Sequence, residues 1–176
     1  MKDAWAIEEL DTRAFAAAIP DLATLLVDAV EGGASVGFVL PFTYADAAAW
    51  WRTLTADVDA GQIVVLLLRG DGGRAIRTAQ LRLAKMPNQR HRADVAKVLV
   101  HRSARRRGFG TALMSSIEEA ARHRGRTLLV LDTISGSDAA LLYERLGWCR
   151  SGEIPKYAAM PDGSLAPTTY YFKELT

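Results

Sequence analysis

The stretch VLVHRSARRRGFGTALM, residues 98–114, places a strand end, a basic loop, two glycines and a helix start in direct succession. Around Gly108 and Gly110, apolar residues recur at helical spacing and predict one buried helix face, at Phe109, Leu113, Ile117 and Ala120. The first N–H groups of a helix lack intrahelical partners and carry partial positive charge, and glycine lets a ligand approach the backbone. A strand, a glycine turn and a helix start in this order therefore form a candidate anion site.

Two common phosphate-binding motifs do not fit this loop. A dinucleotide fold needs a third glycine where this chain has Leu113, and a P-loop needs a Lys-Ser/Thr pair after its last glycine. The pattern that is present is Arg105-x-x-Gly108-x-Gly110, directly after a strand. It resembles the coenzyme A pyrophosphate loop, R/Q-x-x-G-x-G/A, of the GCN5-related N-acetyltransferase (GNAT) family. The alternative is a tight strand-to-helix turn with a solvated basic run.

Length and composition indicate one globular domain spanning residues 1–176. Apolar residues make up 49% of the chain and charged residues 24%, as in ordinary soluble proteins. No apolar run reaches the roughly 18 residues that a membrane span requires, and the acidic, mixed N-terminus is unlike a signal peptide. We therefore expect a cytoplasmic protein that has no membrane partner.

Cysteine, histidine and charge patterns narrow the class of ligand. Cys149 is the single cysteine, and the three histidines are scattered, so neither a disulfide framework nor a metal site is expected. The net charge is only +2, but residues 101–107 contain four arginines and no acid. This local charge favours a small anionic ligand over nucleic acid, which usually meets a broad basic face.

The N-terminal part predicts a strand followed by helices. Residues 5–10 form the strand, Asp11 or Thr12 caps a short helical turn, and Pro20 starts a new helix. The next loop, residues 35–42, is unusually apolar for a connection between helices. It is either a strap folded over the core or a wall of a substrate pocket.

The remaining patterns predict mainly strands. A capping box at residues 43–46 starts a further helix. Strands follow at residues 62–68, 75–83, 92–100 and 127–132, then a helix at 139–146 and a final strand pair around 148–150 and 168–175. Strict alternation in the third strand would place Asp94, Ala96, Val98 and Val100 on one face and Val95, Lys97 and Leu99 on the other. The expected fold class is α/β, an α+β sandwich whose mixed, mostly antiparallel sheet of about seven strands contains one parallel βαβ unit and carries helices on both faces.

A second motif strengthens the resemblance. Residues 139–148, AALLYERLGW, resemble the A-x-x-L-Y-E-x-x-G-F segment of GNAT enzymes and lie one strand beyond the glycine loop, as in that family. Further segments, including Gly33–Phe38 and residues 152–163, resemble the tabtoxin-resistance type of acetyltransferase, which acetylates a small toxic amino acid. The resemblance implies the GNAT fold and an acetyl-CoA-dependent N-acetyltransferase that uses no metal and acts on a primary amine of a small molecule, such as an amino-acid-like toxin or antibiotic.

The resemblance also implies how acetyl-CoA is held. Backbone groups of one strand would pair with the pantetheine arm, at Val98, Leu99 and Val100. The glycine loop would hold the pyrophosphate, through Arg105, Arg106, Arg107, Gly108, Phe109, Gly110 and Thr111. Ala139 and Tyr143 would complete the cofactor site. The family often has Asn where this chain has Gly136, so one pantetheine contact is missing or is made by another group.

Three side chains are candidates for the chemistry. An alkyl ammonium has a pKa near 10, so forming the attacking neutral amine at pH 7 costs on the order of 4 kcal/mol. Asp94 and Asp132 are the candidate bases, and the resemblance implies that Tyr143 protonates the departing thiolate. At the Asp94 position the family pattern has Glu, and the shorter side chain favours a bridging water there. Phe38 and Tyr157 are candidate substrate contacts.

Ordinary structural roles and other function classes remain open at this point. Asp132 fits a strand-end or capping carboxylate, Asp94 an ion pair with Arg92 or Lys97, and Tyr143 a core tyrosine. A non-catalytic acyl-CoA-binding regulator would keep the glycine loop without needing the acids. A protein lysine or N-terminal acetyltransferase is a further alternative, and homodimer formation through the C-terminal strands is undecided.

Overall fold

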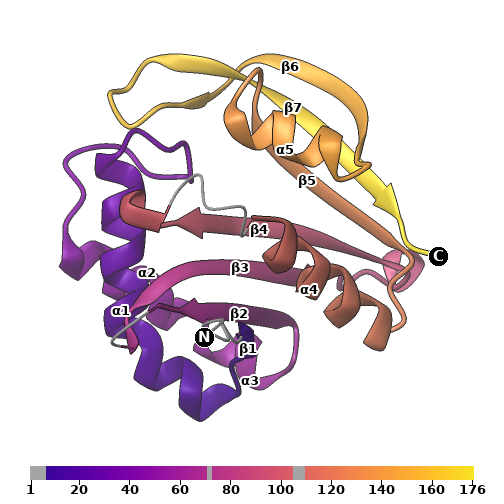
Figure 1. Ribbon diagram of the computed structural model, residues 1–176, viewed down its shortest axis with the longest axis horizontal. Helices are drawn as coiled ribbons and strands as arrows, with labels where there is room; N and C mark the ends of the chain where they lie inside the picture. The colour runs from indigo at the N-terminus through magenta and orange to yellow at the C-terminus, as the bar shows by residue number, and fades with distance from the viewer. Residues whose placement is uncertain (1–6, 71–72, 105–109) are drawn as a thin grey trace, which may run out of the picture.

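The protein, described here from a computed structural model, is built around one seven-stranded sheet (Figure 1). The structure describes residues 7–70, 73–104 and 110–176. The strands are β1 (Ile7–Glu9), β2 (Ile63–Arg69), β3 (Ala75–Leu83), β4 (Arg92–Val100), β5 (Leu128–Ile134), β6 (Cys149–Ala159) and β7 (Leu165–Glu174). Their order is β1-β2-β3-β4-β5-β7-β6, and the β4–β5 pair is parallel while the other pairs are antiparallel. The mixed, mostly antiparallel sheet expected from the sequence is confirmed.

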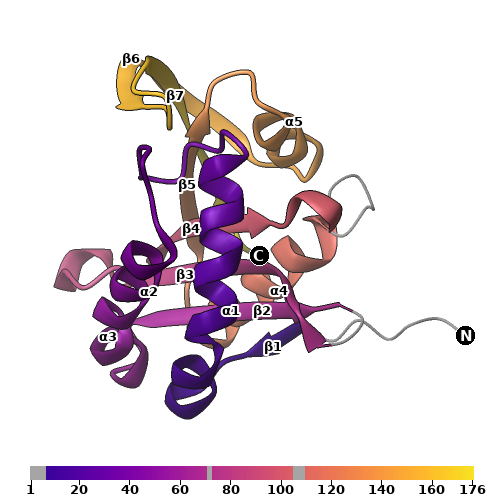
Figure 2. The same cartoon turned by 90° about the vertical axis from the view of Figure 1, so that its left-hand side faces the viewer.

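Helices cover both faces of the sheet. They are α1 (Thr12–Glu31), α2 (Tyr44–Thr53), α3 (Thr55–Asp59), α4 (Gly110–His123) and α5 (Asp138–Arg145), with 3-10 turns η2 (Pro87–Gln89) and η3 (Arg102–Ala104). Figure 2 shows α1 running across the strands. In β2, Val65 and Leu67 pack in the core beneath α1 and α2, whereas Val64 and Leu66 pack in the core beneath α4 and α5. The unbroken apolar run of β2 therefore reflects burial on both faces. Within the described residues, no helix is both long and apolar enough to cross a bilayer.

Helix α1 is longer than the sequence indicates. Proline was expected to start a new helix, but Pro20 lies inside one continuous helix from Thr12 to Glu31. Asp11 caps this helix by accepting from the Ala14 N–H at 2.7 Å. Phe15 and Leu22, on either side of the proline, are both fully buried in the same core. This tertiary packing outweighs the cost of the hydrogen bond that proline cannot donate.

The capping box at the start of α2 is confirmed. The Asp46 N–H donates to Thr43 Oγ1 at 3.1 Å, and the Thr43 N–H donates to an Asp46 carboxylate oxygen at 2.9 Å. These two bonds satisfy backbone donors that the helix start would otherwise leave unpaired. They fix where the apolar loop ends and α2 begins.

Strict alternation in β4 is wrong because the strand contains a bulge. Ala96 lies opposite Gln80 of β3, but Leu99 lies opposite Thr78, so three residues on β4 match two on its partner. Lys97 lies in this bulge and has a φ of +49°. The bulge turns the Leu99 side chain toward α1 and Val98 toward the opposite core.

The parallel strands β4 and β5 separate soon after they meet. They are paired only at Arg92, Ala93 and Asp94, opposite Leu128, Leu129 and Val130, in the part of the chain that the structure describes. Figure 1 shows the two strands spreading apart beyond this short contact. Residues 95–100 of β4 thus present an edge that β5 does not cover.

The strands of the C-terminal hairpin are longer than the sequence predicts. β6 runs from Cys149 to Ala159 although most of its side chains are exposed and show no buried face. β7 lies between β5 and β6, so it joins the hairpin to the sheet.

Candidate functional site

Two adjoining cavities lie where β4 and β5 separate. The larger has a volume of about 1080 Å³ and reaches Gly110 and Thr111 at the start of α4. The smaller has a volume of about 440 Å³, and Lys97, Asp132 and Tyr157 are among the residues that line it. Six residues line both cavities, namely Gly33, Ala34, Val98, Ser137, Ala139 and Tyr143. A ligand in the large cavity and one in the small cavity would therefore meet beside Tyr143.

Most of the candidate cofactor residues within the described ranges line the large cavity. Val98 and Val100 contribute from β4, and Ala139 contributes from α5. Leu99 differs, because its side chain is buried in the core beneath α1. The predicted pyrophosphate contacts Arg105, Arg106, Arg107, Gly108 and Phe109 lie outside the described residues.

Gly110 begins α4 at a point where another helix comes close. A Cβ atom at this position would lie 2.8 Å from Cδ2 of Leu142 on α5. This contact is far shorter than ordinary van der Waals distances, so any side chain at Gly110 would push Leu142 or narrow the cavity that both residues line. The close approach gives a packing reason for glycine there, in addition to the predicted role in anion binding.

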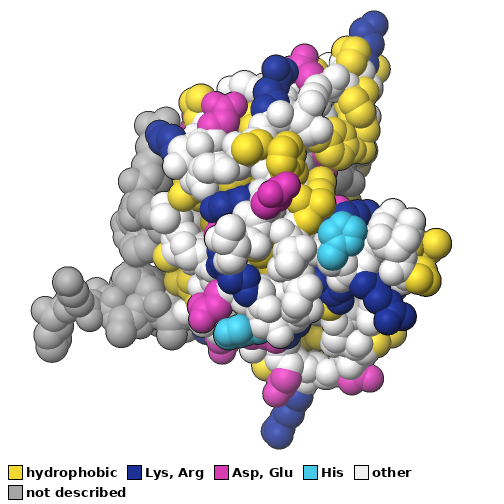
Figure 3. Space-filling view, turned by 90° about the vertical axis from the view of Figure 1, so that its right-hand side faces the viewer, with side chains coloured by type: hydrophobic (Ala, Val, Ile, Leu, Met, Phe, Trp, Pro, Cys, Tyr) yellow, Lys and Arg dark blue, Asp and Glu magenta, His cyan; other side chains and the backbone are white. Residues whose placement is uncertain are grey.

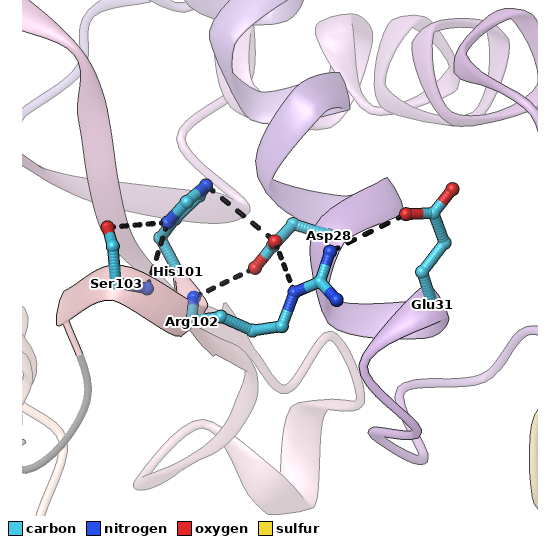
Figure 4. Close-up of polar contacts among 5 residues, drawn as sticks. All are labelled: Asp28, Glu31, His101, Arg102 and Ser103. Atoms are coloured by element: carbon cyan, nitrogen blue, oxygen red, sulfur yellow. Dashed lines mark hydrogen bonds and ion pairs between the residues drawn. The ribbon is translucent and has the colours of Figure 1, made fainter.

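A polar cluster joins the end of α1 to the turn that precedes the glycine loop (Figure 4). Asp28 accepts from the Arg102 N–H at 2.9 Å and from Arg102 Nε at 2.7 Å, and His101 Nε2 lies 3.7 Å away. Burial acts to raise the pKa of Asp28, but the hydrogen bonds and positive charges of Arg102 and His101 outweigh it, so the net pKa is lowered. The buried carboxylate therefore anchors the turn that leads into the loop.

The Asp28→Asn variant is expected to lower the free energy of unfolding by about 1.5–3 kcal/mol at pH 7, because it removes charge-assisted hydrogen bonds. A group whose native pKa is lowered stabilises the fold above its unfolded pKa, here about 3.9, and loses that contribution as pH falls. The difference between wild type and variant should thus shrink below about pH 4. Urea unfolding measured across this pH range checks both statements.

Glu31→Gln is the matched control for this prediction. Glu31 lies 3.6 Å from the same arginine, but its side chain is 53% exposed. An exposed pair contributes little, so this variant should stay within about 0.5 kcal/mol of wild type. Equal losses in both variants would contradict the anchoring role of Asp28.

Tyr143 lies at the junction of the two cavities. It is 5% exposed and its ring packs near those of Trp148 and Tyr171, with centroids 5.9 and 6.3 Å away. Within the described residues its hydroxyl has no hydrogen-bond partner. Burial and the negative charge of Asp132 raise the pKa of Tyr143, so its hydroxyl stays protonated at neutral pH.

Asp132 lines the small cavity from β5. Burial raises the pKa of its carboxyl, the charge of Lys97 acts in the opposite direction, and the charge of Asp94 raises it further. The carboxyl therefore titrates closer to neutrality than an ordinary aspartate, which suits a general base.

The structure places Asp94 near Asp132 but in a different setting. The two lie on the same face of the sheet, because Asp94 is opposite Val130 and Asp132 is two residues further along β5. Arg92 Nη1 donates to both oxygens of Asp94, at 2.8 and 2.7 Å. Asp94 does not line either cavity within the described residues. The ion pair with Arg92 that sequence reasoning left open is present.

The two candidate substrate contacts differ in position. Tyr157 lines the small cavity and accepts a hydrogen bond from the Tyr170 hydroxyl at 2.6 Å. This bond, with burial and the nearby aspartates, raises the pKa of Tyr170 to about 12. Phe38 instead packs against Phe42 and Trp50 at the edge of the core. The apolar loop therefore does both things considered from the sequence. Its first part, Ser35–Gly37, lines the small cavity, and Phe38 and Phe42 pack against the core.

Sequence reasoning missed two residues at this site. Lys97 was assigned to a strand face, but it lies on the bulge and lines the small cavity. Tyr170, opposite Asp132 on β7, was part of a predicted strand and nothing more. Only the pairing of strands brings Lys97 to the cavity and places the Tyr170 hydroxyl against Tyr157, which lines it.

Two observations concern nucleic acid and metal ions as ligands. On the face drawn in Figure 3, basic side chains are interspersed with acidic ones. Among the residues that the structure describes, no group of three or more His, Cys, Asp or Glu could hold a metal ion.

Comparison with known proteins gives one family and many structural neighbours. The model of the acetyltransferase (GNAT) family matches residues 3–148. The YncA protein of Salmonella typhimurium, solved with its cofactor acetyl-CoA, is 20% identical with a TM-score of 0.77, covering 99% of this chain and 95% of its own. The phosphinothricin acetyltransferase of Sinorhizobium meliloti, in complex with acetyl-CoA, is 17% identical with a TM-score of 0.78, covering 97% and 88%.

A third neighbour has a different acceptor in its name. The ribosomal-protein-alanine N-acetyltransferase of Brucella melitensis is 22% identical with a TM-score of 0.76, and the match covers 97% of this chain and 99% of that one. The three neighbours share the fold of this chain, and at such identities the likeness does not identify an acceptor.

Proposed function

Because the chain belongs to the GNAT acetyltransferase family, we propose that it is an N-acetyltransferase that moves the acetyl group of acetyl-CoA onto a primary amine of a small molecule. The observation that carries this proposal is the pair of cavities that adjoin at Tyr143. A long cosubstrate in the large cavity and an amine in the small one would bring thioester and nucleophile together there. The finer resemblance to tabtoxin-resistance enzymes is part of the proposal.

The large cavity suits the proposed cosubstrate. Its volume of about 1080 Å³ is at the upper end of ordinary ligand sites. The uncovered edge of β4 offers backbone groups to the amide groups of a pantetheine arm, which would add to the sheet as a strand does. The start of α4 at Gly110 offers unpaired N–H groups to a pyrophosphate. Acetyl-CoA supplies an activated thioester.

The side chains around the small cavity supply the proton transfers in this proposal. Asp132 would accept the proton of the acceptor ammonium, directly or through water. Tyr143 would donate its proton as the carbon–sulfur bond breaks and the thiolate leaves. Asp94, held by Arg92, would act through a bridging water or through its charge alone.

Calorimetric titration with acetyl-CoA tests the cofactor half of the proposal. Gly110→Glu should weaken binding at least about tenfold, because it adds a negative charge at the helix start and crowds Leu142. Ser115→Glu, with the same charge at an exposed site further along α4, should bind as wild type does. If folded wild-type protein does not bind acetyl-CoA, the proposal is overturned.

Two alternatives give different results in the same study. A non-catalytic acyl-CoA sensor would bind acetyl-CoA but release no CoA thiol with any amine. A protein acetyltransferase would act on peptides in preference to small amines. The 440 Å³ volume of the small cavity favours a small acceptor.

A further inference from the structure

Lys97 is held in a backbone conformation that lysine rarely adopts. Its φ of +49° lies in the left-handed region, which is unfavourable for residues other than glycine, asparagine and aspartate. The bulge places this residue beside the part of β4 that β5 does not cover. Such strain persists where the surroundings enforce it, and it is concentrated at functional sites.

Aromatic rings surround part of the Lys97 ammonium. Nζ lies 5.1 Å from the centroid of Trp50 and 5.6 Å from that of Phe38, both within the range of cation–π attraction. It also lies 3.4 Å from where a Cβ of Gly37 would be. These contacts hold the side chain in place, but none of them supplies an oxygen that could accept a hydrogen bond from the ammonium.

The ammonium lacks an anionic partner within the described residues. No carboxylate lies within 4.0 Å of Nζ there, and no hydrogen bond of Nζ is formed. Burial lowers the pKa of Lys97 to about 8, the charge of Arg82 lowers it too, and the charge of Asp132 acts in the opposite direction. The side chain is therefore mostly protonated at pH 7 and carries donors toward a cavity that it lines.

We propose that Lys97 is a specificity-determining residue that binds an anionic oxygen group, such as a carboxylate, on the acceptor molecule. This inference rests on the proposed function. The small cavity would then match an acceptor that carries both charges, with the amine at Asp132 and the anionic group at Lys97. An incoming anion supplies the partner that a partly desolvated ammonium lacks, whereas a neutral amine without such a group leaves it unpaired.

Paired acceptors test this proposal. The standard amino acids and their C-terminal amides are supplied with acetyl-CoA, and CoA thiol release is measured for each pair. Wild type should favour at least one acid over its amide, and Lys97→Met should lower that preference in kcat/KM by about 10- to 100-fold. Comparing the acid-to-amide ratio between enzymes cancels the different amine pKa values of the two acceptors. Lys97→Arg should retain much of the preference, because it keeps the charge.

Lys156→Met is the matched control. Lys156 is also a lysine with positive φ, +52°, but it is exposed on β6 and does not line the described part of the cavity. It should keep the wild-type acid-to-amide ratio. Thermal melts confirm that each variant is folded before its kinetics are compared.

Three outcomes would overturn the proposal. They are a wild type that prefers amides, a Lys97→Met variant that loses acid and amide turnover equally, and a wild type that acetylates simple alkylamines but neither the amino acids nor their amides. Failure of the wild type to bind acetyl-CoA, or to release CoA thiol with any amine, would instead overturn the proposed function. The two failures are therefore distinguishable.

Discussion

The Tyr143→Phe variant is expected to lose about 10²- to 10⁴-fold in kcat while its Kd for acetyl-CoA changes little. The phenyl ring preserves the packing against Trp148 and Tyr171, so the variant should fold. What it lacks is a hydroxyl that burial keeps protonated until the sulfur carries charge. Single-turnover rates, together with calorimetric binding of acetyl-CoA, separate loss of chemistry from loss of binding.

Tyr171→Phe is the control for this experiment. Tyr171 is also buried, and its hydroxyl donates to Glu144 at 2.9 Å. Its loss should cost stability of about 1 kcal/mol, or somewhat more because the acceptor is charged, with near-normal kcat. Near-normal kcat in Tyr143→Phe would rule out the proton-donor role.

The Asp132→Asn variant is expected to lower kcat/KM by about 10²- to 10⁴-fold, because a neutral amide cannot accept the acceptor's proton. In the wild type, a base must be ionised, so activity should fall as pH drops through its pKa. Since burial raises the pKa of Asp132, this decline should begin at a higher pH than an ordinary aspartate would give. The acidic limb of the pH–rate profile should disappear in the variant.

Asp94→Asn provides the comparison that separates the two carboxylates. Asp94 is bound by Arg92 and lies outside the described lining of both cavities, so its loss should cost less than that of Asp132. It should also shift the acidic limb to lower pH, because it removes a negative charge near Asp132. A larger loss in Asp94→Asn than in Asp132→Asn would reverse the assignment of the base.

Local patterns in the sequence predicted much of this arrangement. The motif at residues 139–148 places Tyr143 on a helix, and the apolar run at residues 127–132 places Asp132 on a strand, although β5 extends beyond the predicted end to Ile134. The capping box predicted the start of α2 correctly, because its hydrogen bonds join residues within one turn of the chain.

The features that the sequence did not reveal depend on distant partners. The bulge at Lys97 exists through the pairing of β4 with β3, and an alternating pattern carries no mark of it. In the sequence Asp28 is one more helix residue, because its partner Arg102 lies 74 positions later and only the fold brings the two together. Pro20 failed as a helix start because buried residues on both sides of it share a core.

The position of β7 between β5 and β6 has a consequence for how the protein is made. During synthesis β6 leaves the ribosome before β7, yet it joins the sheet through β7. A nascent chain could thus form β1 to β5 and α4 while β6, the strand that carries Tyr157, has not yet paired with β7. The wall of the large cavity would be assembled first, and the wall of the small cavity would close only with the last strand.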